Sequence, residues 1–231
     1  MTDDFVWTNE DLKTFQGVYQ GNHHVISGAL FCGSSAGLIS SLEGAVVNLR
    51  MEHCASIAKT LCQAIVVGES SGTVSNCSVS DSIVVSADTN AYTGAIVGLA
   101  KLNSVISYNT SENNRIMNDG NAAGGIVGQS DVSVRDCLVN GGDVSGEEST
   151  GGIVGTVTNS AEGICIHGCQ SSANISGKYH IGGICGYYVQ YTFIEPSGPL
   201  TISECTNRGN LTERAVSDYG LKQYLGGIMG D

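Results

Sequence analysis

The chain has 231 residues, of which 41% are hydrophobic and only 6% aromatic, with 32 glycines and 2 prolines. This composition is typical of short strands and turns packed through small aliphatic side chains, and no apolar run approaches the ~20 residues of a membrane helix. The formal net charge of −12 argues against nucleic acid or an anionic membrane surface as a partner, and we expect no membrane insertion.

A glycine-rich motif recurs along the sequence and organises it. The final glycines of successive copies stand 30, 30, 27, 31 and 44 residues apart. A period near thirty indicates a solenoid, so we expect a single domain over residues 1–231. The clearest copies are Ala123-Gly124-Gly125-Ile126-Val127-Gly128, Thr150-Gly151-Gly152-Ile153-Val154-Gly155, Ile181-Gly182-Gly183-Ile184-Cys185-Gly186 and Leu225-Gly226-Gly227-Ile228-Met229-Gly230.

Residues 1–35 are predicted to form an N-terminal cap and entry strands. Residues 8–15 predict a short helix, which Thr8 would cap and whose buried side would carry Leu12 and Phe15. Residues 15–28 predict two short strands joined by a turn at Gly21-Asn22. A solenoid needs its first coil covered, and this helix is the candidate cover.

Residues 36–186 predict the regular coils. Each repeat contains three brief apolar segments separated by glycine, asparagine, aspartate and serine turns. Stacked coils let every backbone group pair with the coil above and below. The sequence therefore predicts an all-β fold: a right-handed parallel β-helix with three short strands per coil, about six to seven coils, and a short N-terminal capping helix.

Nine cysteines are present, and no Cys-x-x-Cys pair occurs. Most of them follow an apolar residue by three positions, as in Val74/Cys77, and Tyr108 substitutes for cysteine in one repeat. We expect free thiols that pack as a buried ladder, in preference to a metal or redox array. The predicted ladder consists of Cys54, Cys77, Cys137, Cys169 and Cys205.

The segment Cys165-Ile166-His167-Gly168-Cys169 raises the question of a metal site. Strand alternation places Ile164 and Ile166 inside and Cys165 and His167 outside, while Cys169 re-enters the core. The possible ligands then point to different faces, so we expect no metal site and no cofactor.

Residues 187–224 form an aromatic-rich insertion in the last repeat and include both prolines. Insertions in solenoids often form a binding face, although these rings could equally pack the loop against the rod. Residues 225–231 begin a further coil without a cap, and such an open edge could support a homo-oligomer. The candidate binding residues are Tyr187, Tyr188, Tyr191, Phe193, Tyr219 and Tyr224.

The repeats resemble the GLUG-repeat family of bacterial β-helices, which combine a Gly-Gly-Ile-Val-Gly-like strand with an Asn-Cys-type turn. Residues 8–12 and 15–28 are similar to that family's entry helix and the segment before its first coil. The resemblance covers the chain from about residue 6 to its end. It implies a bacterial surface protein, and such repeats also accompany immunoglobulin A1 protease domains. The family has no shared catalytic residues to transfer.

These features favour a non-catalytic surface, adhesive or structural module that binds a carbohydrate or a host or cell-surface protein. The alternatives are a carbohydrate-active β-helix enzyme and a self-assembling scaffold. The carboxylates fall at differing repeat positions, so no catalytic constellation is visible. No leader segment is visible, so we expect either a cytoplasmic protein or an extracellular one whose signal peptide is missing from this sequence.

Overall fold

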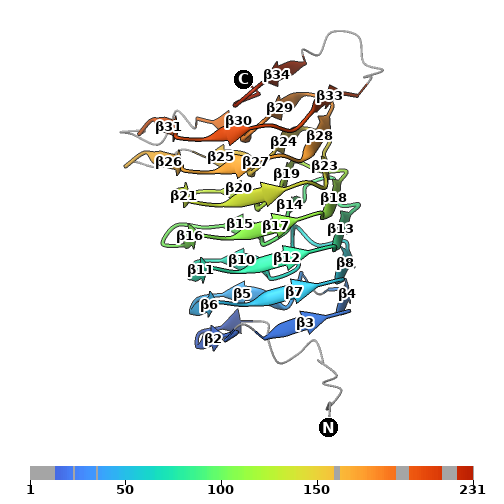
Figure 1. The fold of residues 1–231 in the computed structure, drawn as a ribbon, viewed down its shortest axis with the longest axis vertical. Coiled ribbons are helices and arrows are strands. Elements are labelled where there is room, and N and C mark those ends of the chain that lie inside the picture. Colours follow the sequence, from blue (N-terminus) through green and yellow to red (C-terminus); the bar gives the residue numbers. More distant parts are fainter. Residues whose placement is uncertain are drawn as a thin grey trace.

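The structure is a computed structural model, and it describes residues 14–22, 24–34, 36–158, 162–190, 198–214 and 223–230. Within these ranges the chain forms short strands and no helix, wound into about six coils that stack as a rod (Figure 1). Every pairing between named strands is parallel, for example that of β10 with β15. The predicted all-β parallel solenoid is confirmed.

The strands stack into five sheets, which we call A to E in the order in which each coil visits them. Sheet A consists of β1 Thr14–Phe15, β5 Ile39–Leu42, β10 Val67–Ser70, β15 Val97–Ala100, β20 Val127–Ser130, β25 Val154–Thr158 and β30 Cys185–Val189. Sheet B consists of β2 Val18–Gln20, β6 Ala45–Val47, β11 Thr73–Ser75, β16 Val105–Ser107, β21 Val134–Arg135, β26 Ile164–His167 and β31 Leu200–Ser203.

The other three sheets complete each coil. Sheet C consists of β3 Val25–Ser27, β7 Arg50–Glu52, β12 Ser78–Ser80, β17 Thr110–Glu112, β22 Leu138–Asn140, β27 Gln170–Ser171 and β32 Thr206–Asn207. Sheet D consists of β4 Leu30–Gly33, β8 Ala55–Ala58, β13 Ile83–Ser86, β18 Arg115–Asn118, β23 Asp143–Ser145, β28 Asn174–Gly177 and β33 Leu211–Glu213. Sheet E consists of β9 Cys62–Gln63, β14 Tyr92–Gly94, β19 Ala122–Gly124, β24 Ser149–Gly151, β29 His180–Gly182 and β34 Tyr224–Gly226.

A complete coil therefore contains five strands, and the prediction of three strands per coil is wrong. Two apolar segments that the sequence predicts to be single strands each contain a corner. The glycine motif spans the end of a sheet E strand and the start of the next sheet A strand, as in β19 and β20. The Val74/Cys77 segment is divided between sheets B and C by Asn76, whose φ of 53° turns the chain.

The N-terminal cap differs from the expectation where it can be compared. Residues 8–13 of the predicted helix lie outside the described residues, and Thr14–Phe15 form β1, which pairs with β5. The two entry strands are β2 and β3, as expected, and each pairs with the next coil. In the described part of the chain, no helix has the length and apolar character to span a membrane.

The core consists of columns of similar side chains that run along the rod. The central column of sheet A contains Val67, Val97, Val127, Val154 and Cys185, which are paired in register and have no exposed surface. Each additional coil extends this column by one apolar side chain about 4.8 Å from the last. Burial of aliphatic side chains therefore continues without interruption from coil to coil.

The final glycine of each motif is required by a close approach between backbones. A Cβ on Gly155 of β25 would lie 2.7 Å from the amide nitrogen of Ala123 and 2.6 Å from the carbonyl oxygen of Gly128. A Cβ on Gly186 of β30 would lie 2.6 Å from the amide nitrogen of Thr150. Sheets A and E thus pack so tightly at this corner that only glycine fits, which explains why the motif recurs.

The corner between sheets B and C carries most of the predicted cysteine ladder. A residue with positive φ, such as Asn76 or Asp136, is followed by a side chain that points inward. From β7 to β32, the hydrogen bonds between successive strands place the inward side chains in one column. The column contains Leu49, Cys77, Asn109, Cys137, Cys169 and Cys205.

Two residues were assigned to this column incorrectly. Cys54 lies at the following corner, between sheets C and D, in register with Ser82. The same three-residue spacing occurs at both corners, so the sequence alone makes Met51/Cys54 look equivalent to Val74/Cys77. The strand register shows that the pair equivalent to Val74/Cys77 is Val46/Leu49. Tyr108 has a φ of 57° and is 61% exposed, and the inward position belongs to Asn109.

Two buried asparagines supply hydrogen bonds that the sheets cannot make at these corners. The side-chain oxygen of Asn109 accepts from the amide of Cys77 at 3.0 Å, and its Nδ2 donates to the carbonyl of Val74 at 2.9 Å. Asn114 does the same for the amide of Ser82 and the carbonyl of Val79, each at 2.8 Å. An unsatisfied buried backbone group is costly, so these side chains hold neighbouring coils together.

We predict that Gly155→Ala destabilises the protein by about 3 kcal/mol, because the added methyl group meets backbone atoms that cannot move independently. The matched control is Gly227→Ala, since a Cβ there would meet nothing within 4 Å. Urea denaturation followed by circular dichroism measures both. Equal stability of the two variants would contradict the close-packed corner.

We predict that Asn109→Leu destabilises the protein by about 2 kcal/mol, although the two side chains are of similar size, because a buried amide and a buried carbonyl lose their partner. Asn140→Ala is the control: Asn140 is exposed on β22, and we expect a change within ~0.5 kcal/mol. The same denaturation experiment tests this pair. An unchanged midpoint for Asn109→Leu would show that the corner needs no side-chain hydrogen bond.

Candidate functional site

The predicted binding residues fall into two groups. Tyr187 and Tyr188 lie on β30 and Tyr224 begins β34, whereas Tyr191, Phe193 and Tyr219 lie outside the described residues. Three strands within the predicted insertion, β31, β32 and β33, stack in register on β26, β27 and β28. The described part of the aromatic-rich stretch is therefore built on a coil of the rod, at the end opposite β2 and β3 (Figure 1).

Three rings, of which Tyr224 is exposed and the other two are partly buried, stack where sheets A and E meet. The ring centroids of Tyr187 and His180 are 4.1 Å apart with an interplanar angle of 26°. Those of His180 and Tyr224 are 5.1 Å apart, and the rings are nearly parallel at 3°. We call Tyr187, His180 and Tyr224 the aromatic stack. Its three rings come from two sheets and two coils.

The register of the sheets explains the stack. His180 and Tyr224 are partners in sheet E, so their side chains project from neighbouring strands on the same side. Tyr187 is the register partner in sheet A of Thr156, which is buried, and lies one coil above it. His180 was missed in the sequence analysis. The signal was present, since His180 and Tyr224 each directly precede a copy of the glycine motif.

Polar groups lie within two residues of His180 and Tyr224 in the sequence or bond to such residues. Lys178 forms an ion pair with Glu147 at 2.6 Å, and both side chains are about 30% exposed. The side-chain amide of Gln223 donates to the carbonyls of Lys178 at 2.9 Å and Arg214 at 3.0 Å. Tyr224 remains 37% exposed beside them. The stack is thus a fixed, partly exposed apolar surface with a polar rim, a combination typical of binding faces.

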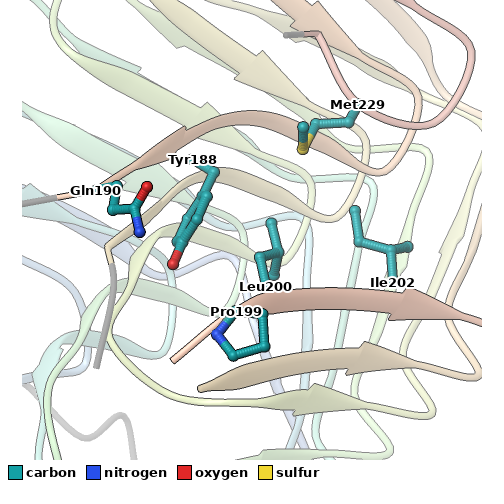
Figure 2. A pocket seen from close by; sticks show the side chains of 6 residues that line it. All are labelled: Tyr188, Gln190, Pro199, Leu200, Ile202 and Met229. Carbon is teal, nitrogen blue, oxygen red and sulfur yellow. The ribbon is translucent and has the colours of Figure 1, made fainter. Parts of the chain in front are cut away.

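Tyr188 points the other way and helps to line a pocket of about 490 Å³. Figure 2 shows Tyr188 and Met229 on one side of this pocket, facing Pro199, Leu200 and Ile202 on the other. The Tyr188 hydroxyl donates to the carbonyl of Gly198 at 2.9 Å, and burial raises the pKa of Tyr188. Gln190 completes the lining of this largely apolar pocket.

The pocket continues the hydrophobic core. Ile202 follows Ile166 in the inward column of sheet B, and Met229 follows Cys185 in that of sheet A. Its volume falls within the range of ~300–1,000 Å³ that small-molecule sites occupy. Tyr188 therefore lines this pocket and is not part of the aromatic stack.

Cys165 and His167 lie on the outer face of β26, as predicted, while Ile164, Ile166 and Cys169 are buried. The Nδ1 atom of His167 lies 3.0 Å from the hydroxyl of Ser203 on the adjacent strand. Within the described ranges, no three His, Cys, Asp or Glu side chains come together as a candidate metal site.

Comparison with known proteins extends this description only at the level of fold. No protein-family model matches the sequence, and no curated protein matches it. One solved structure is similar, a "putative immunoglobulin A1 protease" from Bacteroides ovatus at 1.30 Å resolution, with a TM-score of 0.61 and 19% sequence identity. The match covers 90% of this chain and 66% of that one, so the present chain corresponds to about two thirds of the solved protein. The likeness supports the parallel β-solenoid fold.

Proposed function

We propose that this protein is a non-catalytic binding module, and that the aromatic stack is its binding face. The observation that carries this proposal is the contact of Tyr187, His180 and Tyr224 at the rod surface. Each ring belongs to a strand that is paired in a sheet, so the surface is formed before a ligand arrives. Binding to such a surface loses little conformational entropy.

The ligand that best fits is a carbohydrate, or a surface protein that presents a similar apolar face. Tyrosine combines a flat apolar ring with a hydroxyl group, and the apolar face of a sugar ring packs on such a surface while its hydroxyls bond to a polar rim. Lys178, Glu147 and Gln223 supply that rim. The net charge of −12 favours a neutral or basic ligand over a polyanionic one.

Surface display in a bacterium is part of the proposal. The Gly-Gly-Ile-Val-Gly copies resemble those of GLUG-repeat proteins, and the similar solved structure comes from a bacterium. Right-handed winding is proposed on general grounds, since nearly all parallel crossover connections have that hand. We likewise propose that the chain belongs to the GLUG family, that it is located at the cell surface and that it self-associates through the last coil.

We predict that Tyr224→Ala and Tyr187→Ala each weaken binding at least about fivefold, because a central aromatic contact is worth more than ~1 kcal/mol. A glycan array identifies the ligand, and isothermal titration then measures each dissociation constant. The control is Tyr108→Asn, which removes an exposed tyrosine from another corner and retains a residue type that tolerates positive φ.

Three results would separate the proposed function from its alternatives. Equal affinities for all three variants would remove the aromatic stack from the binding site. Release of shortened chains from a bound glycan would identify a carbohydrate-active enzyme. Sedimentation that shows filaments or defined oligomers, together with an absence of glycan or protein binding, would favour a self-assembling scaffold.

A further inference from the structure

Three consecutive thiols lie side by side in the column at the corner between sheets B and C. Cys137, Cys169 and Cys205 precede three neighbouring strands of sheet C, β22, β27 and β32, which are paired in register. The Cys169 thiol donates to the carbonyl of Val134 at 3.8 Å, and the Cys205 thiol donates to the equivalent carbonyl of the next coil, that of Ile166, at 3.5 Å. In-register residues on adjacent parallel strands are about 4.8 Å apart, within the ~4.4–6.8 Å between Cα atoms that a disulfide spans.

We propose that Cys169 and Cys205 are a redox-active pair, which closes to a disulfide when the protein meets a small-molecule disulfide oxidant. Both residues are free thiols in the structure. This assignment goes beyond ligand binding and does not depend on it.

The position of Cys205 favours a disulfide between Cys169 and Cys205 over one between Cys137 and Cys169. Cys205 is partly accessible, whereas Cys137 and Cys169 are almost completely buried. Among the residues that the structure describes, its strand, β32, is the outer strand of sheet C and pairs with β27. Cys205 can therefore meet an oxidant, and β32 can shift by the small distance that an S–S bond requires. β22 and β27 are each held by strands on both sides.

The reaction balances with oxidised glutathione as the oxidant. The Cys205 thiolate attacks one sulfur of the glutathione disulfide, which forms a mixed disulfide and releases one reduced glutathione. The Cys169 thiol then loses its proton and attacks the Cys205 sulfur, which releases the second. The protein loses two electrons and two protons, and one glutathione disulfide becomes two thiols.

The surroundings make this exchange slow at neutral pH. The hydrogen bond with Cys137, together with burial, raises the pKa of the Cys169 thiol to about 12. The hydrogen bond with Cys169, and then burial, raises the pKa of the Cys205 thiol well above its usual range. The thiolate is the reacting species, so we expect the rate to increase with pH.

Closure would tie the last coil to the coil before it. The bond encloses residues 169–205, a loop that includes Tyr187 and Tyr188 and two walls of the pocket, Leu200 and Ile202. Cross-linking a loop of this length restricts the unfolded chain and should stabilise the last coil.

The test is equilibration of the whole protein with oxidised and reduced glutathione at about pH 8.5, followed by alkylation and peptide mass mapping without reduction. Digestion after basic residues and after glutamate separates Cys205 from Cys137 and from the peptide that carries Cys165 and Cys169. We expect a cross-linked peptide pair with the bond at Cys169 and Cys205, and a melting temperature about 5 °C higher that dithiothreitol reverses.

Matched variants make the result specific. Cys169→Ser and Cys205→Ser should each abolish the cross-link and the shift in melting temperature. Cys77→Ser should preserve both, because Cys77 occupies the same column between Leu49 and Asn109 and has no neighbouring thiol. Cys165→Ser should also preserve them, since Cys165 lies on the outer face.

Several outcomes would overturn the proposal. They are an unchanged mass for the oxidised protein, Cys205 trapped only as a glutathione adduct, or a cross-link that survives Cys169→Ser. Because Cys205→Ser alters an outer strand, its circular dichroism spectrum is compared first with that of the wild-type protein. None of these readouts involves a glycan, so failure here leaves the proposed binding function intact, and failure of binding leaves this pair intact.

Discussion

The fold depends on the in-register stacking of parallel strands, coil upon coil. Each backbone amide and carbonyl in a strand bonds to the coil above or below, and equivalent side chains are placed about 4.8 Å apart along the rod. The column from Val67 through Val97, Val127 and Val154 to Cys185 shows the result in the core. The corners limit this arrangement, because the chain must turn there while the strands of successive coils stay in register.

The chain turns at its corners in two different ways. Between sheets E and A, backbones approach so closely that Gly155 and Gly186 leave no room for a Cβ. Between sheets B and C, a residue with positive φ turns the chain, and the following side chain enters the core. Asn109 can occupy that inward position only because its amide group satisfies the amide of Cys77 and the carbonyl of Val74.

The same register that builds the core also creates the candidate sites. Residues at the same repeat position become neighbours in space, whatever their separation in the sequence. His180 and Tyr224 stack for this reason, although 43 residues separate them. Cys169 and Cys205 adjoin for the same reason. A solenoid thus converts a periodic pattern into linear arrays on its surface and in its interior, and a departure from the pattern at one coil remains local.

Much of the architecture could be predicted from the sequence alone. The recurring glycine motif indicated a parallel solenoid and the burial of the motif's aliphatic residues, because periodicity and turn residues encode these properties directly. The number of strands per coil could not be read in this way. A corner formed by one residue, such as Asn76, leaves no gap in an apolar segment, so five strands resembled three.

Only the tertiary structure decided which side chains meet. Two corners share one spacing, so Cys54 could be assigned to the wrong column until the pairing of β8 with β13 placed it beside Ser82. Tyr187 and His180 come together only because sheets A and E pack at a glycine corner, and no sequence spacing records that angle. The sequence determined the repeat, whose chemistry is local, whereas the contacts between columns depend on how each corner aligns one coil with the next.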